Sequence, residues 1–208
     1  SMGGSTILTE VPEMFGAAES LMNLSETDYL FNQTVARVND FKNYFKSHNQ
    51  PIYENPSPGN KKGGISSLED KSLGCTQKSG SAPVMGVLSY GEPVKEKGLN
   101  LLSAPGNDLV ASTALAASGA HIVLFTTGRG TPFASPVPTV KISTNNQLAK
   151  KKQNWIDFNC GVMVNDTPLD ELSENLLDFV LEIASGKKSN SEEAGFHDMA
   201  IFKQGVTL

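Results

Sequence analysis

The stretch from Leu101 to Phe133, LLSAPGNDLVASTALAASGAHIVLFTTGRGTPF, constrains the fold of this chain more than any other. Its pattern predicts a strand that ends near Ser103, a tight loop, and an Ala-rich helix capped by Asn107 or Asp108. A second strand follows from His121 to Phe125, and its β-branched and apolar residues are typical of a strand buried on both faces. We therefore expect a βαβ unit in which the two strands are parallel and joined by a right-handed crossover.

The rest of the chain alternates short apolar runs with amphipathic segments, which is the pattern of an α/β fold. Further strands are expected at Ser5–Glu10, Met85–Ser89, Leu99–Ser103, Val137–Ser143 and Met199–Phe202. Helices are expected at Pro12–Met22, Glu26–Ser47, from the capping-box pattern Ser66–Glu69 to about Leu73, and at Asp170–Ala184. The prediction is three layers: a mostly parallel twisted sheet with helices on both faces, Rossmann-like. No G-x-G-x-x-G follows a strand, so the usual dinucleotide fingerprint is absent.

Length and charge narrow the class of protein. A chain of 208 residues can bury the core of one α/β domain, and we favour that over two small domains. The net charge of -5 argues against a nucleic-acid partner, and no apolar run reaches the roughly 18 residues that span a bilayer. Cys75 and Cys160 form no close-spaced motif, which indicates reduced thiols and a cytoplasmic location. Ser1-Met2 is typical of a cloning remnant, so residues 3–208 are expected to be a domain cut from a longer protein.

The loops of the predicted βαβ unit indicate where a ligand would bind. In open α/β sheets, ligands bind beyond the carboxyl ends of the strands, near helix N-termini whose free N–H groups attract anions. Two loops should lie at that edge, Ala104–Asp108 and Thr126–Phe133, and the second carries Arg129 between two glycines. The sequence therefore predicts a site for a small anion along one edge of one parallel sheet.

Several charged residues near this edge allow two interpretations. Arg129 could grip a carboxylate with its two-pronged guanidinium or simply pair with a neighbouring acid, and the sequence leaves both open. Glu10 and Glu13 flank the first junction between strand and helix, where an acid can cap the helix or act as a base; capping is the favoured interpretation. Lys61 and Lys62 are expected in solvent, although one could reach an anion from its long loop.

The sequence predicts no metal site within this chain. His48 sits near a helix C-terminus, His121 begins a strand, and His197 lies in a polar tail, so none has a second ligand at a suitable spacing. Cys75 could act as a thiolate beside Lys78, but a buried or half-buried structural cysteine is the favoured interpretation.

Six blocks carry a resemblance to a known family. They are GGSTILTEVPEMFGAA (Gly3–Ala18), PIYENPSPGNKKGGISSLEDKSLGCTQKSG (Pro51–Gly80), GLNLLSAPGNDLVASTALAASGAHIVLFTTGRGTPF (Gly98–Phe133), VPTVKISTN (Val137–Asn145), WIDFNCG (Trp155–Gly161) and AIFKQGVTL (Ala200–Leu208). Together these blocks resemble the C-terminal domain of the altronate/galactarate dehydratase family of sugar-acid hydro-lyases. Their sequences resemble the altronate branch more than the galactarate branch. The resemblance covers essentially residues 3–208.

The resemblance implies a domain of an enzyme that dehydrates D-altronate to 2-keto-3-deoxy-D-gluconate in hexuronate breakdown. It also implies Fe²⁺, or Mn²⁺ in support, with most metal ligands in N-terminal and middle domains of the same enzyme. A homo-oligomer is compatible with it. This domain would supply groups that hold the sugar acid: Glu10, Lys61, Gly106, Asn107, Arg129 and Thr131. The catalytic base stays unassigned. Two alternatives remain: a lyase domain for a related acid such as galactarate or sulfolactate, and a sugar-acid-binding domain without chemistry.

Overall fold

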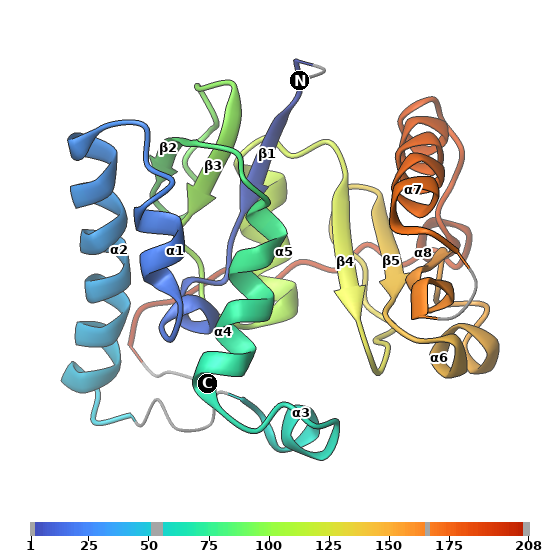
Figure 1. Cartoon of the computed structure of the whole chain (residues 1–208), viewed down its shortest axis with the longest axis horizontal. Helices are drawn as coiled ribbons and strands as arrows, with labels where there is room; N and C mark the ends of the chain where they lie inside the picture. Colours follow the sequence, from blue (N-terminus) through green and yellow to red (C-terminus); the bar gives the residue numbers. More distant parts are fainter. Residues whose placement is uncertain (1–2, 51–55, 165–166, 206–208) are drawn as a thin grey trace. The chain divides into compact units, whose positions relative to one another are not determined.

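The computed structural model describes residues 3–50, 56–164 and 167–205, and it forms two compact units (Figure 1). Unit 1 comprises Ser1–Gly119 and Ile201–Leu208, and unit 2 comprises Ala120–Ala200. Each unit holds a three-stranded parallel sheet, in the order β1-β3-β2 in unit 1 and β4-β5-β6 in unit 2. The α/β class is confirmed, but the expectation of a single sheet is wrong. No helix in the described part of the chain is long and apolar enough to cross a membrane.

The elements follow the expected order closely. Unit 1 contains β1 (Ser5–Leu8), η1 (Val11–Met14), α1 (Ala18–Met22), α2 (Asp28–Ser47), α3 (Pro58–Lys62), α4 (Leu68–Thr76), η2 (Gln77–Ser79), β2 (Val84–Leu88), β3 (Gly98–Leu102) and α5 (Asp108–Ala117). Unit 2 contains β4 (Val123–Thr127), β5 (Thr139–Ser143), α6 (Asn146–Lys151), β6 (Phe158–Asn159), η3 (Cys160–Val164), α7 (Leu169–Ala184) and α8 (Asn190–Glu193). The long loop that was expected to carry Lys61 and Lys62 contains α3, and residues 51–55 before it lie outside the described residues.

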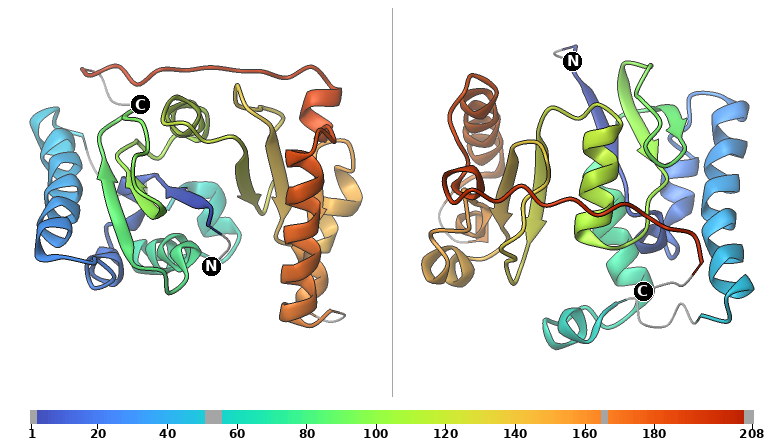
Figure 2. Two further views of the ribbon diagram at one scale, coloured as in Figure 1. Left: turned by 90° about the horizontal axis from the view of Figure 1, so that it is seen from above. Right: turned by 180° about the vertical axis from the view of Figure 1, so that it is seen from behind.

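Unit 1 has the expected three layers, with β3 at the centre of its sheet. On one face of β3, Leu99 and Leu101 pack against Leu21 of α1 and Met14 of η1. On the other face, Leu102 packs in a cluster with two small residues of α5, Ala111 and Ala114. Figure 2 shows α5 on one side of this sheet and α1 on the other. This alternation of side chains buries β3 on both faces.

The predicted βαβ unit is wrong because β3 and β4 lie in different sheets, and the reason is the position of β3. Both of its hydrogen-bonding edges are occupied, because Leu101 is in register with Leu8 of β1 and Leu102 with Leu88 of β2. A central strand has no free edge for a third partner. The strand β4 instead pairs with β5 as an edge strand, and its Leu124 is 50% exposed rather than buried on both faces.

The helix expected at Pro12–Met22 is divided into η1 and α1 by a close approach to α4. A Cβ on Gly16 would lie 2.9 Å from Cα of Glu69, and the Gly16 N–H donates to Ser72 Oγ at 2.9 Å. Only a glycine lets the two backbones come so close. The helix α4 itself begins one residue later than the capping-box pattern indicated, because Ser67 rather than Ser66 caps it through Asp70 N.

The C-terminal segment returns to unit 1 and forms no strand, so the strand expected at Met199–Phe202 is wrong (Figure 2). The Phe202 N–H donates to the hydroxyl of Tyr90 at 2.9 Å. The Phe202 ring packs 5.6 Å from the ring of Tyr44, edge to face, and 5.8 Å from that of Tyr90. Side-chain contacts therefore hold the segment where strand pairing was expected.

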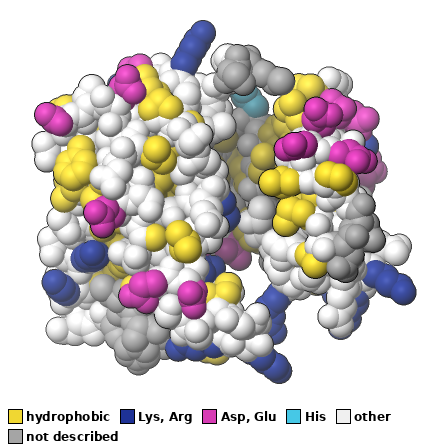
Figure 3. All heavy atoms as spheres, in the orientation of Figure 1, with side chains coloured by type: hydrophobic (Ala, Val, Ile, Leu, Met, Phe, Trp, Pro, Cys, Tyr) yellow, Lys and Arg dark blue, Asp and Glu magenta, His cyan; other side chains and the backbone are white. Residues whose placement is uncertain are grey.

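In unit 2, the helix α7 covers one face of the sheet. Val140 and Ile142 of β5 pack in one cluster with Ile183 of α7. This confirms the amphipathic helix expected at Asp170–Ala184, although Leu169 and Leu181 of the same helix are exposed. Figure 3 shows hydrophobic side chains interspersed with acidic ones over this helix. The apolar stripe of α7 is therefore wider than the face of the sheet that it covers, and part of the stripe stays exposed.

The opposite face of β5 buries a lysine. Lys141 is only 1% exposed, and its ammonium group lies 5.8 Å from the centre of the Phe133 ring. Burial lowers the pKa of Lys141, while the charges of Asp157 and Asp198 act in the opposite direction. The backbone N–H of Lys141 also donates to Asp157 Oδ2 at 2.7 Å. These groups lie inside unit 2, so we regard Lys141 as part of its core.

Candidate active site

The carboxyl ends of β1 and β3 form an edge of the unit 1 sheet, and the loops that follow them are bonded together. Val11 N donates to the carbonyl of Ala104 at 3.1 Å, and Thr9 Oγ1 donates to that of Leu102 at 3.1 Å. Neighbouring parallel strands bring their following loops to one edge. The prediction that the loop after β3 lies at such an edge is therefore confirmed, and its partner is the loop after β1.

Glu10 occupies an unusual position in this edge. Its backbone is left-handed, with φ 69° and ψ 55°, a conformation that costs a residue with a side chain about 1–2 kcal/mol. The Glu10 carbonyl accepts a hydrogen bond from Glu13 N at 2.9 Å, which holds the turn. The side chain makes no capping hydrogen bond to η1, so the favoured interpretation of Glu10 as a helix cap is wrong. The turn instead places its half-buried carboxyl group near Glu13 and Asp108.

Glu13 of η1 is the shared acceptor of a cluster with two residues of α4. Its Oε2 lies 3.0 Å from Lys71 Nζ and accepts a hydrogen bond from Cys75 Sγ at 3.3 Å. Lys71 and Cys75 project from the same face of α4 because they are four residues apart. From the other side, Gly106 approaches so closely that a Cβ there would lie 3.3 Å from Glu13 Cγ. We call Glu13, Lys71 and Cys75 the Glu13 cluster.

These surroundings change the protonation of the groups around Glu13. Burial, reinforced by the charge of Glu13, raises the pKa of Glu10 to about 8, against the opposing charges of Lys78 and Lys71. Burial and the charge of Glu13 also raise the pKa of the Cys75 thiol to about 12. Burial, the largest single cause, acts to lower the pKa of Lys71, but the charge and hydrogen bond of Glu13, together with the charges of Cys75 and Glu10, raise it overall. Near pH 7, Glu10 is therefore mostly a neutral acid, Lys71 a cation and Cys75 a thiol.

Asp108, at the start of α5, has a pKa raised first by partial desolvation and then by the charge of Glu13. The helix begins with Asn107, whose Oδ1 accepts a hydrogen bond from Val110 N at 3.1 Å, as the sequence predicted. The edge thus combines an acid that can exchange its proton near neutral pH with an ordered helix start. An acid whose pKa lies near the operating pH is suited to general acid–base chemistry.

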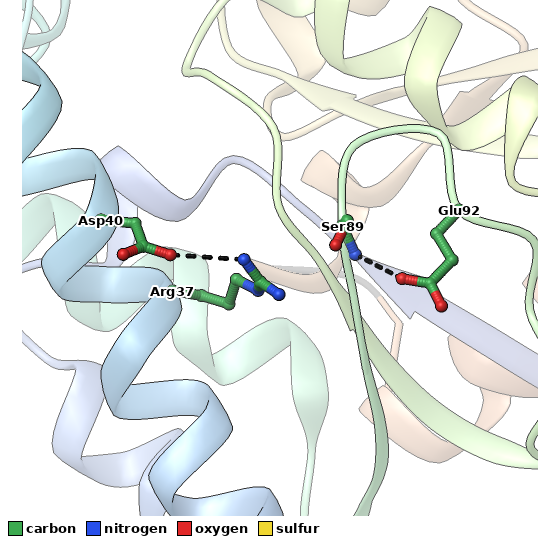
Figure 4. A network of polar contacts seen from close by, with 4 residues as sticks. All are labelled: Arg37, Asp40, Ser89 and Glu92. Carbon is green, nitrogen blue, oxygen red and sulfur yellow. Dashed lines mark hydrogen bonds and ion pairs between the residues drawn. The ribbon is translucent and has the colours of Figure 1, made fainter.

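The loop after β2 offers a contrasting acid, Glu92. Its Oε2 accepts a hydrogen bond from the backbone N–H of Ser89 at 2.9 Å, close to an Arg37–Asp40 ion pair of 3.3 Å (Figure 4). The Ser89 N–H is the main cause that lowers the pKa of Glu92. Glu92 is therefore held as a carboxylate, whereas Glu10 keeps its proton.

The raised pKa of Glu10 predicts a pH dependence of stability. Between the ordinary value of 4.5 and about 8, the unfolded chain loses this proton while the folded chain holds it. Folding is therefore favoured most by this group below pH 4.5, and its contribution is lost as the pH rises to 8. We expect urea denaturation to show a larger free energy of unfolding at pH 5 than at pH 8. The difference between the two values should shrink in Glu10→Gln; an equal difference in both proteins would contradict the assignment.

The six residues expected to hold a sugar acid divide between the two sheets. Glu10, Gly106 and Asn107 lie at the carboxyl edge of the unit 1 sheet. Lys61 is exposed in the last turn of α3, and among the described residues no side-chain bond joins it to the Glu13 cluster. Arg129 and Thr131 follow β4 in unit 2. The expected single edge is therefore wrong, because β3 and β4 belong to different sheets.

The loop after β4 is held by its own polar side chains. Thr127 Oγ1 accepts hydrogen bonds from Arg129 N at 3.3 Å and Gly130 N at 2.9 Å, and Asn145 Nδ2 donates to the carbonyl of Gly128 at 3.0 Å. The Arg129 side chain is exposed, and none of the described carboxylates forms an ion pair with it. A neighbouring acid in the described chain thus does not explain Arg129, and its grip on a carboxylate stays a prediction.

The described residues do not fit a resident metal ion. Across residues 3–50, 56–164 and 167–205, no group of three or more His, Cys, Asp or Glu side chains is arranged to hold one. The donors of the Glu13 cluster are also engaged with one another, since Glu13 Oε2 lies 3.0 Å from Lys71 Nζ and accepts a hydrogen bond from Cys75 Sγ. The thiolate role considered for Cys75 does not fit either.

Sequence reasoning did not find the partnership of Glu13 with Lys71 and Cys75. The spacing of Lys71 and Cys75 on one helix face was visible, but nothing in the sequence said which segment that face meets. The partnership depends on the contact of α4 with η1 at Gly16, and no local sequence pattern indicates that contact.

Comparison with known proteins decides the family. The model of the family described as D-galactarate/Altronate dehydratase, C-terminal, matches residues 1–207. The chain belongs to this family. It is 59% identical over 206 residues to the altronate dehydratase of Escherichia coli (strain K12) and 59% identical over 209 residues to that of Bacillus subtilis (strain 168), covering 99% and 100% of this chain. It is 33% identical over 204 residues to the galactarate dehydratase (L-threo-forming) of E. coli, covering 96% of this chain and 39% of that enzyme.

The match is to part of each relative. The chain spans 42% of the length of both altronate dehydratases. Membership of the D-galactarate/altronate dehydratase family, in its C-terminal domain, is therefore shown, and the resemblance noted in the sequence is confirmed.

Proposed function

We propose that this domain provides a proton-donating half-site of a hydro-lyase that removes water from a sugar acid, D-altronate in the first place. The observation that carries the proposal is Glu10, a half-buried acid with a pKa of about 8 at the carboxyl edge of the unit 1 sheet. The identity of 59% to enzymes named altronate dehydratase supports altronate over the related acids.

The elimination step requires two proton transfers, and the enol that it forms then tautomerises to the 2-keto-3-deoxy acid. Dehydration to a 2-keto-3-deoxy acid removes the proton on C2, next to the carboxylate, and expels the hydroxyl group of C3 as water. Hydroxide is a poor leaving group, so an acid must give it a proton as the C–O bond breaks. The neutral carboxyl group of Glu10 is suited to this step and would become a carboxylate. We propose that the base that takes the C2 proton lies in the rest of the enzyme.

Positive charge must also stabilise the carboxylate of the substrate as the C2 proton leaves. Iron, or manganese in support, could supply it, and we propose that the metal ligands lie in parts of the enzyme beyond this domain. Lys61, Arg129 and Thr131 remain proposed contacts to the substrate. A cytoplasmic location and assembly with N-terminal and middle domains belong to the same proposal.

A chimera tests this function. The part of E. coli altronate dehydratase that matches this chain would be replaced by residues 3–208, with the unaltered E. coli enzyme as the control. With Fe²⁺ present, we expect keto-acid formation from D-altronate at a rate above that from galactarate or sulfolactate. A chimera that unfolds cooperatively yet dehydrates none of these acids would contradict the proposal. The alternative of a binding domain without chemistry rested on the absence of a recognisable acid–base pair in the sequence, and the raised pKa of Glu10 supports the hydro-lyase over it.

A further inference from the structure

We infer that Glu13 is the positioning residue of this site: held by Lys71 and Cys75 on one oxygen and packed against Gly106, it fixes the arrangement in which Glu10 meets the substrate. No comparison or motif assigns this role. The catalytic part of this inference rests on the proposed function. The influence of Glu13 on Glu10 can be tested without measuring activity.

The geometry of the Glu13 cluster supports the inference first. Glu13 and Lys71 form their 3.0 Å ion pair with side chains only 17% and 18% exposed, and Cys75 donates to the same oxygen. Two donors on one oxygen restrict how this carboxylate can turn. Its backbone is fixed as well, through the hydrogen bond from Glu13 N to the carbonyl of Glu10. The side chain and the turn that carries Glu10 are thus held together.

Energetics argue that the cluster is more than packing. A mostly buried ion pair loses much of its Coulombic gain to desolvation, and apolar residues of similar volume often stabilise a fold as well or better. A left-handed glutamate adds strain at the same turn. Proteins usually keep such unfavourable features only at functional sites. Two of them in one loop at a sheet edge therefore indicate a functional site.

The charge of Glu13 reaches every acid of the edge. It raises the pKa of Glu10, of Asp108 and of the Cys75 thiol, in each case after desolvation as the larger cause. Lys71 and Lys78 oppose this effect on all three groups. Displacing Glu13 should therefore change the protonation of all three groups together.

Gly106 provides a probe that leaves the charges in place. Its φ is not left-handed, and the three heavy atoms nearest to a Cβ there all belong to Glu13, with Cγ at 3.3 Å, Oε1 at 3.6 Å and Cδ at 3.9 Å. The added methyl group of Gly106→Ala must therefore push the Glu13 side chain by a few tenths of an ångström. Gly74→Ala is the matched control, because Gly74 lies in α4 beside Cys75 and a Cβ there meets nothing within 4 Å.

The first experiment uses this chain alone and follows the protonation of Glu10 and of Cys75. Carbon-13 NMR would follow the Glu10 carboxyl group, and the rate of alkylation by iodoacetamide would follow Cys75. In Glu13→Gln, we expect the pKa of Glu10 to fall by about one unit or more, because a like charge is removed. Alkylation of Cys75 should become faster at a given pH as more thiolate forms. Gly106→Ala should move both readouts, and Gly74→Ala neither.

The second experiment uses the chimera and the pH profile of kcat/KM. The limb of this pH profile that is assigned to Glu10 should shift along the pH axis in Glu13→Gln and in Lys71→Met. Lys71→Arg should restore much of the original profile. Unmoved titrations and profiles in Glu13→Gln and Gly106→Ala would overturn the inference. If the titrations move in this chain but the folded chimera is inactive on every acid, positioning by Glu13 holds and the proposed function fails.

Discussion

Glu10→Gln in the chimera is expected to lower kcat for D-altronate by about 10²–10⁴-fold, the usual contribution of a general acid. Glutamine has the same size and can keep the left-handed turn held by Val11 and Glu13, but it has no acidic proton to give to the departing hydroxyl group. Since the proton moves only as the C–O bond breaks, KM should change little. Steady-state kinetics with D-altronate would measure both constants.

The control for this prediction is Glu92→Gln. Glu92 is a glutamate in the loop after β2, yet its carboxylate already accepts the Ser89 N–H, and a glutamine oxygen can do the same. We expect its kcat to stay within about twofold of the chimera's, since surface substitutions of this kind rarely matter. Glu10→Gln with more than half of the original kcat would exclude Glu10 as the proton donor. A pH profile that loses its upper limb in Glu10→Gln would support it.

The sequence predicted the elements of this fold well because their signals are local. The stripe of α2, the cap of α5 by Asn107 and the stripe of α7 all depend on residues within a few positions of one another. Which strands pair depends instead on competition for edges. Once β1 and β2 occupy both edges of β3, the helix α5 leads out of unit 1, and β4 begins a second sheet. No pattern near β4 distinguishes that outcome from a βαβ unit.

Of the two loops predicted to form the site, only Ala104–Asp108 lies at the carboxyl edge of the unit 1 sheet, and the chemistry of the site was not predicted. Glu10, Gly106 and Asn107 were placed correctly at a carboxyl edge, because parallel strands dictate it. The role of Glu10 was misjudged because capping is the ordinary use of an acid before a helix, and its side chain makes no such bond. The cause is tertiary: a half-buried position near Glu13 and Asp108.

Gly161→Ala is expected to have the largest effect on stability, with unit 2 destabilised by about 3 kcal/mol or more. Gly161 is buried, and a Cβ there would lie 2.6 Å from Cα of Asn145 and even closer to N of Asn146. Both are backbone atoms, so no side chain can turn away to make room. Asn145 caps α6 through Leu148 N at 2.8 Å and holds the loop that carries Arg129 through its bond to the carbonyl of Gly128. Displacing Asn145 would therefore disturb the helix and the loop together.

Hydrogen exchange would locate the damage. Because the two units have separate sheets, we expect faster exchange of the amides of β5 and α7 in Gly161→Ala, with less change in β3. Gly74→Ala serves as the control, since its methyl group enters open space in a helix, where alanine is favoured over glycine by roughly 0.5–1 kcal/mol. Equal protection of unit 2 in both variants would mean that the chain after β6 can move away from Asn145. The arrangement of the Arg129 loop would then not depend on Gly161.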